Sequence, residues 1–358
     1  MNRLKNIPLG VTYATLVLAI VPGLGFYYFK MYGKQNSWLA MIISNLLGLL
    51  FVKMTLAIRN YDKNKNIFEI NKIALGKFLG TLTNLIFSLV IGLIMVIICW
   101  HSYIFLKSNF FNDTPFFILG IGLFLPLIFI SNKSNNILLK TNLIIFPLIV
   151  FLCLTAFGGL IFQADLNNLK PFAEVKTSAL FLNIFTVFTV SYLPTYTITA
   201  LSDFQNKKGI FKYLLIASLI NIGIVFFTYA VLGKTIIDMV DFSEFFVLRK
   251  IGNSIGSSRI DSFIILEWLL CIFSFTSSCL LFIRNYLQFQ IPKFKTNYIL
   301  IITILLFFIS LNIFDNITVG KNFIIKVLPY VCFFTLFLIN LIIFASLKFK
   351  TKFNSHKQ

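Results

Sequence analysis

Long apolar segments alternate with short polar connections along almost the whole chain of 358 residues. An apolar run of about 18 residues or more is long enough to cross the hydrocarbon core of a bilayer as a helix. Ten runs approach or exceed this length, and we expect a transmembrane helix in each: 8–29, 37–58, 79–106, 115–131, 141–163, 179–201, 212–232, 261–287, 297–314 and 324–347. The pattern predicts an all-α integral membrane protein with a single membrane domain, 1–358.

The first run is interrupted near its end by Pro22, Gly23 and Gly25. Every backbone polar group in hydrocarbon needs a partner inside the protein, so such a break is tolerated only where protein or a water-filled cavity surrounds it. Broken helices of this kind are typical of transporters, which bind ligands near the bilayer midplane. We expect a ligand site here; the alternative is a packing notch for a neighbouring helix.

The sixth run has a second interruption at Pro194, which removes a backbone donor and clashes with the preceding turn. Ser191, Tyr192 and Thr195 surround this proline with hydroxyl groups. These hydroxyls either contact a ligand or make helix-to-helix hydrogen bonds beside a kink.

Ten spans with both chain ends on one side fit two inverted repeats of five helices, 8–163 and 179–347, followed by a basic tail, 348–358. The first and sixth spans are counterparts in such a repeat, so both are expected to be discontinuous. The interruptions described above meet this expectation.

Charge indicates the orientation. The chain is 58% hydrophobic and 12% charged, with a formal net charge of +19. If the N-terminus is cytoplasmic, most of the 31 Lys and Arg residues fall in cytoplasmic segments, as the positive-inside rule requires. We therefore place both termini in the cytoplasm. The basic charge then lies near anionic lipid headgroups and does not indicate nucleic-acid binding.

Reactive side chains are sparse. The five cysteines all lie in apolar runs without metal-ligand spacing, so we expect small buried side chains with no disulfide, metal or cofactor. The sequence has no Ser–His pairing, no nucleotide-binding loop and no evident pair of intramembrane carboxylates. We expect no enzyme activity.

Six stretches in order along the chain carry a family resemblance. They are GKQNSWL at 33–39, IFEI at 67–70 with LGKFLG at 75–80, NDTP at 112–115, FP at 146–147, DLNNLKP at 165–171, and LRKI at 248–251 with RID at 259–261 and Trp268. Together they resemble the spore germination receptor B-subunit family, the endospore germination permeases. These are ten-helix relatives of the amino acid–polyamine–organocation transporters.

The resemblance implies a membrane subunit of a nutrient germinant receptor in the inner spore membrane. Such a subunit binds a small nutrient, commonly an amino acid, and works with an A subunit and a lipoprotein C subunit. Binding would shift the complex towards a state that triggers ion release and germination.

Four further residues are candidates for coupling or for an outer vestibule. Glu267 is the one carboxylate well inside a predicted span, and it either carries a proton or binds a ligand ammonium, or is an interfacial acid paired with Arg259. His101 is either pH-sensitive or an interfacial histidine with satisfied hydrogen bonds. Arg249 and Arg259 form an outer vestibule, a subunit contact or a solvated loop.

Three functions remain open from the sequence. The leading one is a ligand-gated sensor whose nutrient shifts the population of two conformations. The alternative is a proton- or cation-coupled amino-acid transporter, because a fold does not fix this choice. The third is a structural scaffold with an empty site.

Overall fold

The computed structural model describes residues 7–170, 176–201, 207–255, 260–291, 293–294 and 297–355, which form helices and connecting segments with no β-strand. The α-helices are α1 (Ile7–Leu18), α2 (Ile20–Leu24), α3 (Ser37–Arg59), α4 (Ile67–Leu75), α5 (Lys77–Asn109), α6 (Phe116–Ser131), α7 (Asn135–Leu160), α8 (Thr177–Tyr192), α9 (Lys207–Met239), α10 (Ser243–Ile255), α11 (Ile260–Gln290), α12 (Tyr298–Asn312), α13 (Ile317–Lys326), α14 (Leu328–Cys332) and α15 (Ile339–Ser355). The other helical segments are π-helices η2 (Phe29–Gly33) and η7 (Phe333–Leu338), and 3₁₀-helices η3 (Lys34–Asn36), η4 (Ile161–Gln163), η5 (Leu166–Leu169) and η6 (Leu193–Ala200).

Seven helical segments of 24 to 33 residues are long and apolar enough to cross a membrane. Each of the ten predicted runs overlaps at least one helix of the structure. The count of ten membrane crossings stays a prediction, because α1 and α6 are shorter apolar helices and α12 joins α13 through a bend of 107°. The inverted repeat likewise stays a prediction.

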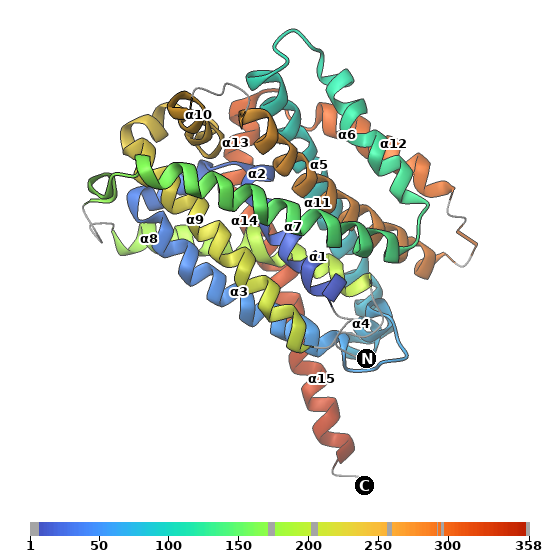
Figure 1. Ribbon diagram of the computed structural model, residues 1–358. Helices are drawn as coiled ribbons and strands as arrows, with labels where there is room; N and C mark the ends of the chain where they lie inside the picture. The colour runs from blue at the N-terminus through green and yellow to red at the C-terminus, as the bar shows by residue number, and fades with distance from the viewer. Residues whose placement is uncertain are drawn as a thin grey trace.

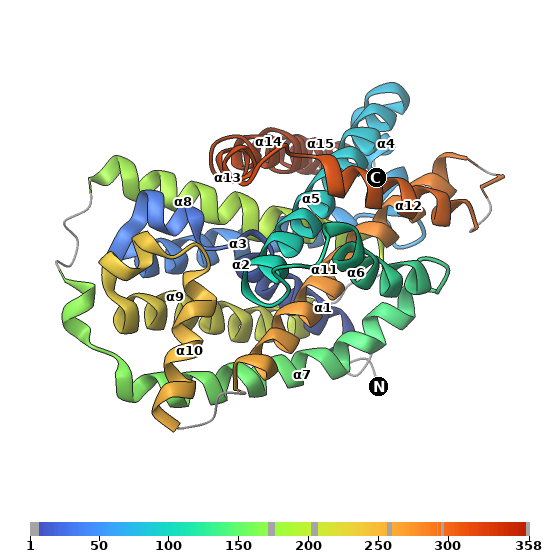
Figure 2. The ribbon, with the colours of Figure 1, turned by 90° about the horizontal axis from the view of Figure 1, so that it is seen from above.

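Helix α11 passes through the middle of the bundle, where it contacts α1, α5, α6 and α7 (Figure 2). Helices α6 and α12 pack against each other at one edge. The short helix α4 and the last helix α15 lie at one end of the molecule, and α10 and α13 lie at the opposite end (Figure 1). The short helices at the second end cover the region of the first helix break.

The break in the first predicted span is confirmed, and it is centred on Gly25. Helix α1 ends at Leu18, whose carbonyl has no amide partner four residues later because that residue is Pro22. Pro22 and Gly23 nevertheless lie inside α2. The chain leaves helical geometry at Gly25, with φ of 76° and ψ of −176°. The unwound point therefore lies two residues after the Pro-Gly pair.

The sixth predicted span is also discontinuous. Helix α8 ends at Tyr192, and Pro194 is the second residue of the eight-residue 3₁₀-helix η6 that follows. A 3₁₀ run longer than three or four residues is uncommon and often marks a hinge or strain. By contrast, Pro126 and Pro147 lie inside the uninterrupted helices α6 and α7. Proline alone therefore does not break these helices.

Two segments outside the predicted runs are partly helical. Residues 233–260, between the seventh and eighth predicted runs, hold the end of α9 after a non-helical Gly233, followed by α10. The predicted tail, 348–358, is helical as far as Ser355, because α15 continues beyond the apolar run. All five cysteines are free and buried, as predicted.

Close packing of α3 against α8 depends on Gly48. A Cβ atom at Gly48 would lie 2.2 Å from the ring of Tyr192. Gly122 in α6 offers a matched contrast, because a Cβ there meets no atom within 4 Å.

We expect Gly48→Ala to lower the free energy of unfolding by about 1–3 kcal/mol, the usual cost of overpacking a core. Gly122→Ala should be neutral or stabilising by up to about 1 kcal/mol, since Ala is the better helix former. Denaturant titration of the purified protein in detergent micelles measures both. Equal effects of the two changes would contradict the packing of Tyr192 on Gly48.

Candidate functional site

The break at Gly25 is packed against His101 of α5. A Cβ atom at Gly25 would lie 2.9 Å from Nε2 of His101 and 3.1 Å from the ring of Tyr27. The backbone conformation with φ of 76° is also one that side chains with a Cβ rarely adopt. Only glycine therefore fits this position without a shift of its neighbours.

His101 is fully buried at the break. Its Nε2 lies 3.1 Å from the hydroxyl of Tyr27, and the two rings meet edge to face at 5.5 Å. On another side the imidazole packs against Phe242, with centroids 5.4 Å apart. The structure thus places His101 beside the predicted ligand site, buried within the bundle.

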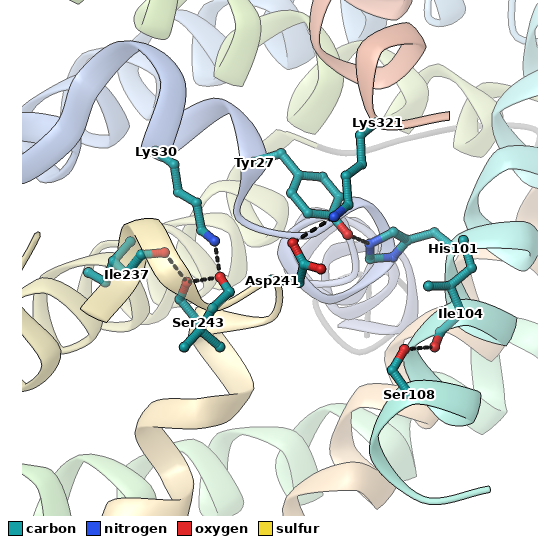
Figure 3. Close-up of polar contacts among 10 residues, drawn as sticks. Tyr27, Lys30, His101, Ile104, Ser108, Ile237, Asp241, Ser243 and Lys321 are labelled. Atoms are coloured by element: carbon teal, nitrogen blue, oxygen red, sulfur yellow. Dashed lines mark hydrogen bonds and ion pairs between the residues drawn. The ribbon is translucent and has the colours of Figure 1, made fainter. Parts of the chain in front are cut away.

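Charged side chains from two other segments cover the break (Figure 3). Nζ of Lys321, on α13, lies 2.6 Å from Oδ1 of Asp241, in the α9–α10 connection. The amine of Lys30, which follows the break in η2, donates to the backbone carbonyl of Val240. The hydroxyl of Ser243 donates to the same carbonyl at 3.2 Å. Polar contacts therefore tie the α9–α10 connection to both η2 and α13.

The hydroxyls around the second interruption are buried, and two of them have partners within the protein. Tyr192 donates to Oδ1 of Asn45 at 2.7 Å, and its oxygen lies 3.0 Å from Oγ of Ser218. Thr195 donates to the carbonyl of Tyr192 at 2.6 Å. Ser191 is also buried. Tyr192 and Thr195 thus stabilise the change from α8 to η6.

The two interruptions belong to one region of the bundle. Helix α1 contacts η6, α2 contacts α8, and α11 contacts all of α1, α2 and η6. The two discontinuous spans are therefore neighbours in the structure.

A cavity of about 60 Å³ lies between α7, α9, α10 and α11, beside α2. Its walls include Val21 of α2, Glu244 of α10 and Glu267 of α11, with mostly apolar side chains around them. Oε1 of Glu267 accepts a hydrogen bond from the thiol of Cys153 at 3.3 Å. No pair of carboxylates was expected from the sequence, but the fold brings two of them to one cavity.

Burial governs the chemistry of Glu244, which lies in α10, outside the membrane-crossing helices. Its side chain is 8% exposed, and Oε2 has no hydrogen-bond partner among the described residues. Loss of hydration disfavours the charged carboxylate and raises the pKa of Glu244 to about 8, while Lys30 acts in the opposite direction. The carboxyl group therefore holds a proton at neutral pH.

Of the two arginines predicted for an outer vestibule, the structure describes one, Arg249. The guanidinium of Arg249 lies 5.0 Å from the ring centroid of Phe245, a residue of the cavity wall. Arg259 lies outside the described residues. In the part of the chain that the structure describes, no group of three or more His, Cys, Asp or Glu side chains could hold a metal ion.

Sequence reasoning missed the cover of the break. Lys30, Asp241 and Lys321 are far apart in sequence and resemble ordinary loop charges. One signal was available: Lys30 directly follows the interrupted run, and the connection 233–260 is acidic at Asp238, Asp241 and Glu244. Complementary charges beside a break indicate a contact between the two segments.

Three comparisons with known proteins agree with this architecture. A family model described as "Spore germination protein" matches residues 11–319. Spore germination protein B2 of Bacillus subtilis (strain 168) is 28% identical over 139 residues, a match that spans 37% of this chain and 37% of that protein. A Na⁺-coupled sialic acid symporter, solved in a substrate-bound outward-open state, superposes with a TM-score of 0.64 at 12% identity, over 92% of this chain and 79% of the symporter. The symporter shares the fold.

The close contact between Gly25 and His101 predicts a cost beyond backbone strain. Gly76 has a similar φ of 87°, but a Cβ there meets nothing within 4 Å. We expect Gly76→Ala to lower the free energy of unfolding by about 1–2 kcal/mol through the left-handed backbone alone. Gly25→Ala should lower the free energy of unfolding by about 1–3 kcal/mol more than Gly76→Ala does, because His101 and Tyr27 must move.

Denaturant titration in detergent micelles compares the two variants. A Gly25→Ala cost equal to that of Gly76→Ala would show that His101 does not constrain the break.

Proposed function

Because the chain belongs to the spore germination protein family and has a transporter-like fold, we propose that it is a membrane subunit of a nutrient germinant receptor. In this role it binds a small nutrient, for which an amino acid is the best candidate, at the break of the first span. Partner A and C subunits and a place in the inner spore membrane, with both termini cytoplasmic, belong to the same proposal.

The break at Gly25 is the observation that carries this proposal. An unwound backbone inside a helical bundle exposes N–H groups, half-helix N-termini and carbonyls, which suit the carboxylate and ammonium of an amino acid. The neighbouring residues Gly23, Tyr27 and His101 are buried around this point. Pro22, Ser191, Tyr192, Pro194 and Thr195 would shape the site through the two discontinuous spans.

The mechanism we propose is a population shift. Nutrient at the break would bind one arrangement of the first and sixth spans better than the other, and only this difference in affinity can move the equilibrium. The contacts of Lys30 and Lys321 with the α9–α10 connection hold the described arrangement. When nutrient binds, these contacts would rearrange, and the partner subunits would sense this change.

Active transport is the second candidate, and the symporter-like fold favours it. Glu267, with Cys153 as its hydrogen-bond donor, is the candidate proton carrier. Uptake of labelled amino acid by the purified chain in proteoliposomes, driven by a proton or sodium gradient, would support transport. Nutrient binding without uptake would support sensing.

Germination of spores that lack this gene tests the receptor proposal. We expect loss of the response to one nutrient in a panel of single amino acids. Wild-type protein and Gly122→Leu should restore the response, because Gly122 faces open space. Gly25→Leu should not restore it, because the side chain would fill the break.

Immunoblots of spore membranes control for the amount of each variant. Full restoration by Gly25→Leu would contradict a site at the break. Normal germination of the deletion strain, with no paralogue present, would overturn the receptor proposal.

A further inference from the structure

The cavity lined by Glu244 and Glu267 is separate from the discontinuity at Gly25. Among the described residues, Val21 is the wall residue that comes from the first span, and the other walls come from α7, α9, α10 and α11. Phe157 and Phe227 stack with centroids 5.1 Å apart and form one half-buried wall. The cavity is thus an apolar space with two acidic groups.

Some polar atoms in the cavity wall have hydrogen-bond partners within the protein, and one does not. The hydroxyl of Thr228 donates to the carbonyl of Ile224 in its own helix, so it is already engaged. Glu267 accepts from Cys153. Oε2 of Glu244 is buried without a partner in the described part of the chain, although a buried polar atom without a hydrogen bond is costly. This oxygen is the one that a ligand would satisfy.

The chemistry of the walls selects the ligand class. The described walls hold two carboxyl groups and no basic side chain, so they offer an anion no cationic partner. A bare Ca²⁺ ion takes six to eight oxygen ligands, which these walls do not supply. An alkylammonium ion fits both features, because its N–H groups pair with carboxylate and its chain contacts aromatic and aliphatic walls.

We propose that this cavity binds a primary ammonium ion with a short apolar chain, held by Glu244 with Glu267 as the second carboxylate. The ligand is distinct from the nutrient at the helix break. Helix α10 carries Glu244 and directly follows the α9–α10 connection, which covers the break. A ligand bound to Glu244 would therefore also affect the position of this connection.

Binding is coupled to a proton. The neutral Glu244 carboxyl releases its proton to solvent, and the carboxylate then pairs with the intact ammonium ion. The titratable groups around Glu244 are Glu267, in the wall of the same cavity, and Tyr27, Tyr28, Lys30 and Asp241 from the break and its cover. The pKa of Glu244 is about 8 without a ligand. The affinity for the ammonium ion should therefore increase about tenfold for each unit by which the pH rises towards 8, and should be constant above pH 8.

Binding of radiolabelled n-butylamine to the purified full chain, measured by scintillation proximity in phosphatidylglycerol nanodiscs between pH 6 and 9, tests the proposal. We expect saturable binding that unlabelled n-butylamine displaces and that n-butanol and butyrate do not. Glu244→Gln should weaken binding by about thirtyfold or more and remove its pH dependence. Asp113→Asn, a change at an exposed carboxylate, should leave binding unchanged.

Two further arms keep the test decisive. Ala156→Leu fills the cavity without altering a carboxyl group and should also abolish binding. Phosphatidylethanolamine in the nanodiscs carries the same ammonium chemistry, and competition by it would identify a lipid headgroup as the natural occupant. Equal displacement by n-butanol, or full binding by folded Glu244→Gln protein, would overturn the proposal without bearing on germination through the helix break.

Discussion

The unwound backbone at Gly25 sets the main constraint on this molecule. Backbone polar groups at membrane depth must be enclosed by protein or by water in a cavity, because lipid offers them no partner. Here α5 presents His101 directly to the glycine, and the α9–α10 connection and α13 cover the same point. A Cβ atom at this position would displace His101. The break and its cover therefore form one unit, in which neither can change without the other.

The cover links the helix break to the acidic cavity. Asp241 lies in the α9–α10 connection and contacts α13, and Ser243, the first residue of α10, donates to the carbonyl of Val240. Glu244, the residue after Ser243, lines the cavity. A movement of this connection that frees Lys30 would also move Glu244. The two sites are thus physically linked by one short segment, the α9–α10 connection with the start of α10.

Apolar run length and the mirrored interruptions predicted most of the helical framework, because hydrocarbon leaves few alternatives to the helix. The short helices α4, α10 and α13 were not predicted as separate elements, since the apolar patterning of short polar segments is weak. Pro22 attracted attention as the breaker, yet a proline near the start of a short helix is tolerated, and the positive φ falls at Gly25. The meeting of Glu244 with Glu267 depends on how α10 folds over α11, which no local pattern encodes.

The strength of the cover decides how readily the break can respond to a ligand. The Lys321–Asp241 pair is partly exposed, with Asp241 63% accessible, and such pairs contribute about 0–1 kcal/mol. A switch from 1:99 to 99:1 needs about 5.5 kcal/mol of differential binding, so this ion pair alone cannot hold the described arrangement against a ligand. Most of the resistance must come from the buried packing of His101, Tyr27 and Phe242. A nutrient that contacts these three aromatic side chains would therefore act on the contacts that contribute most of the free energy holding the described arrangement.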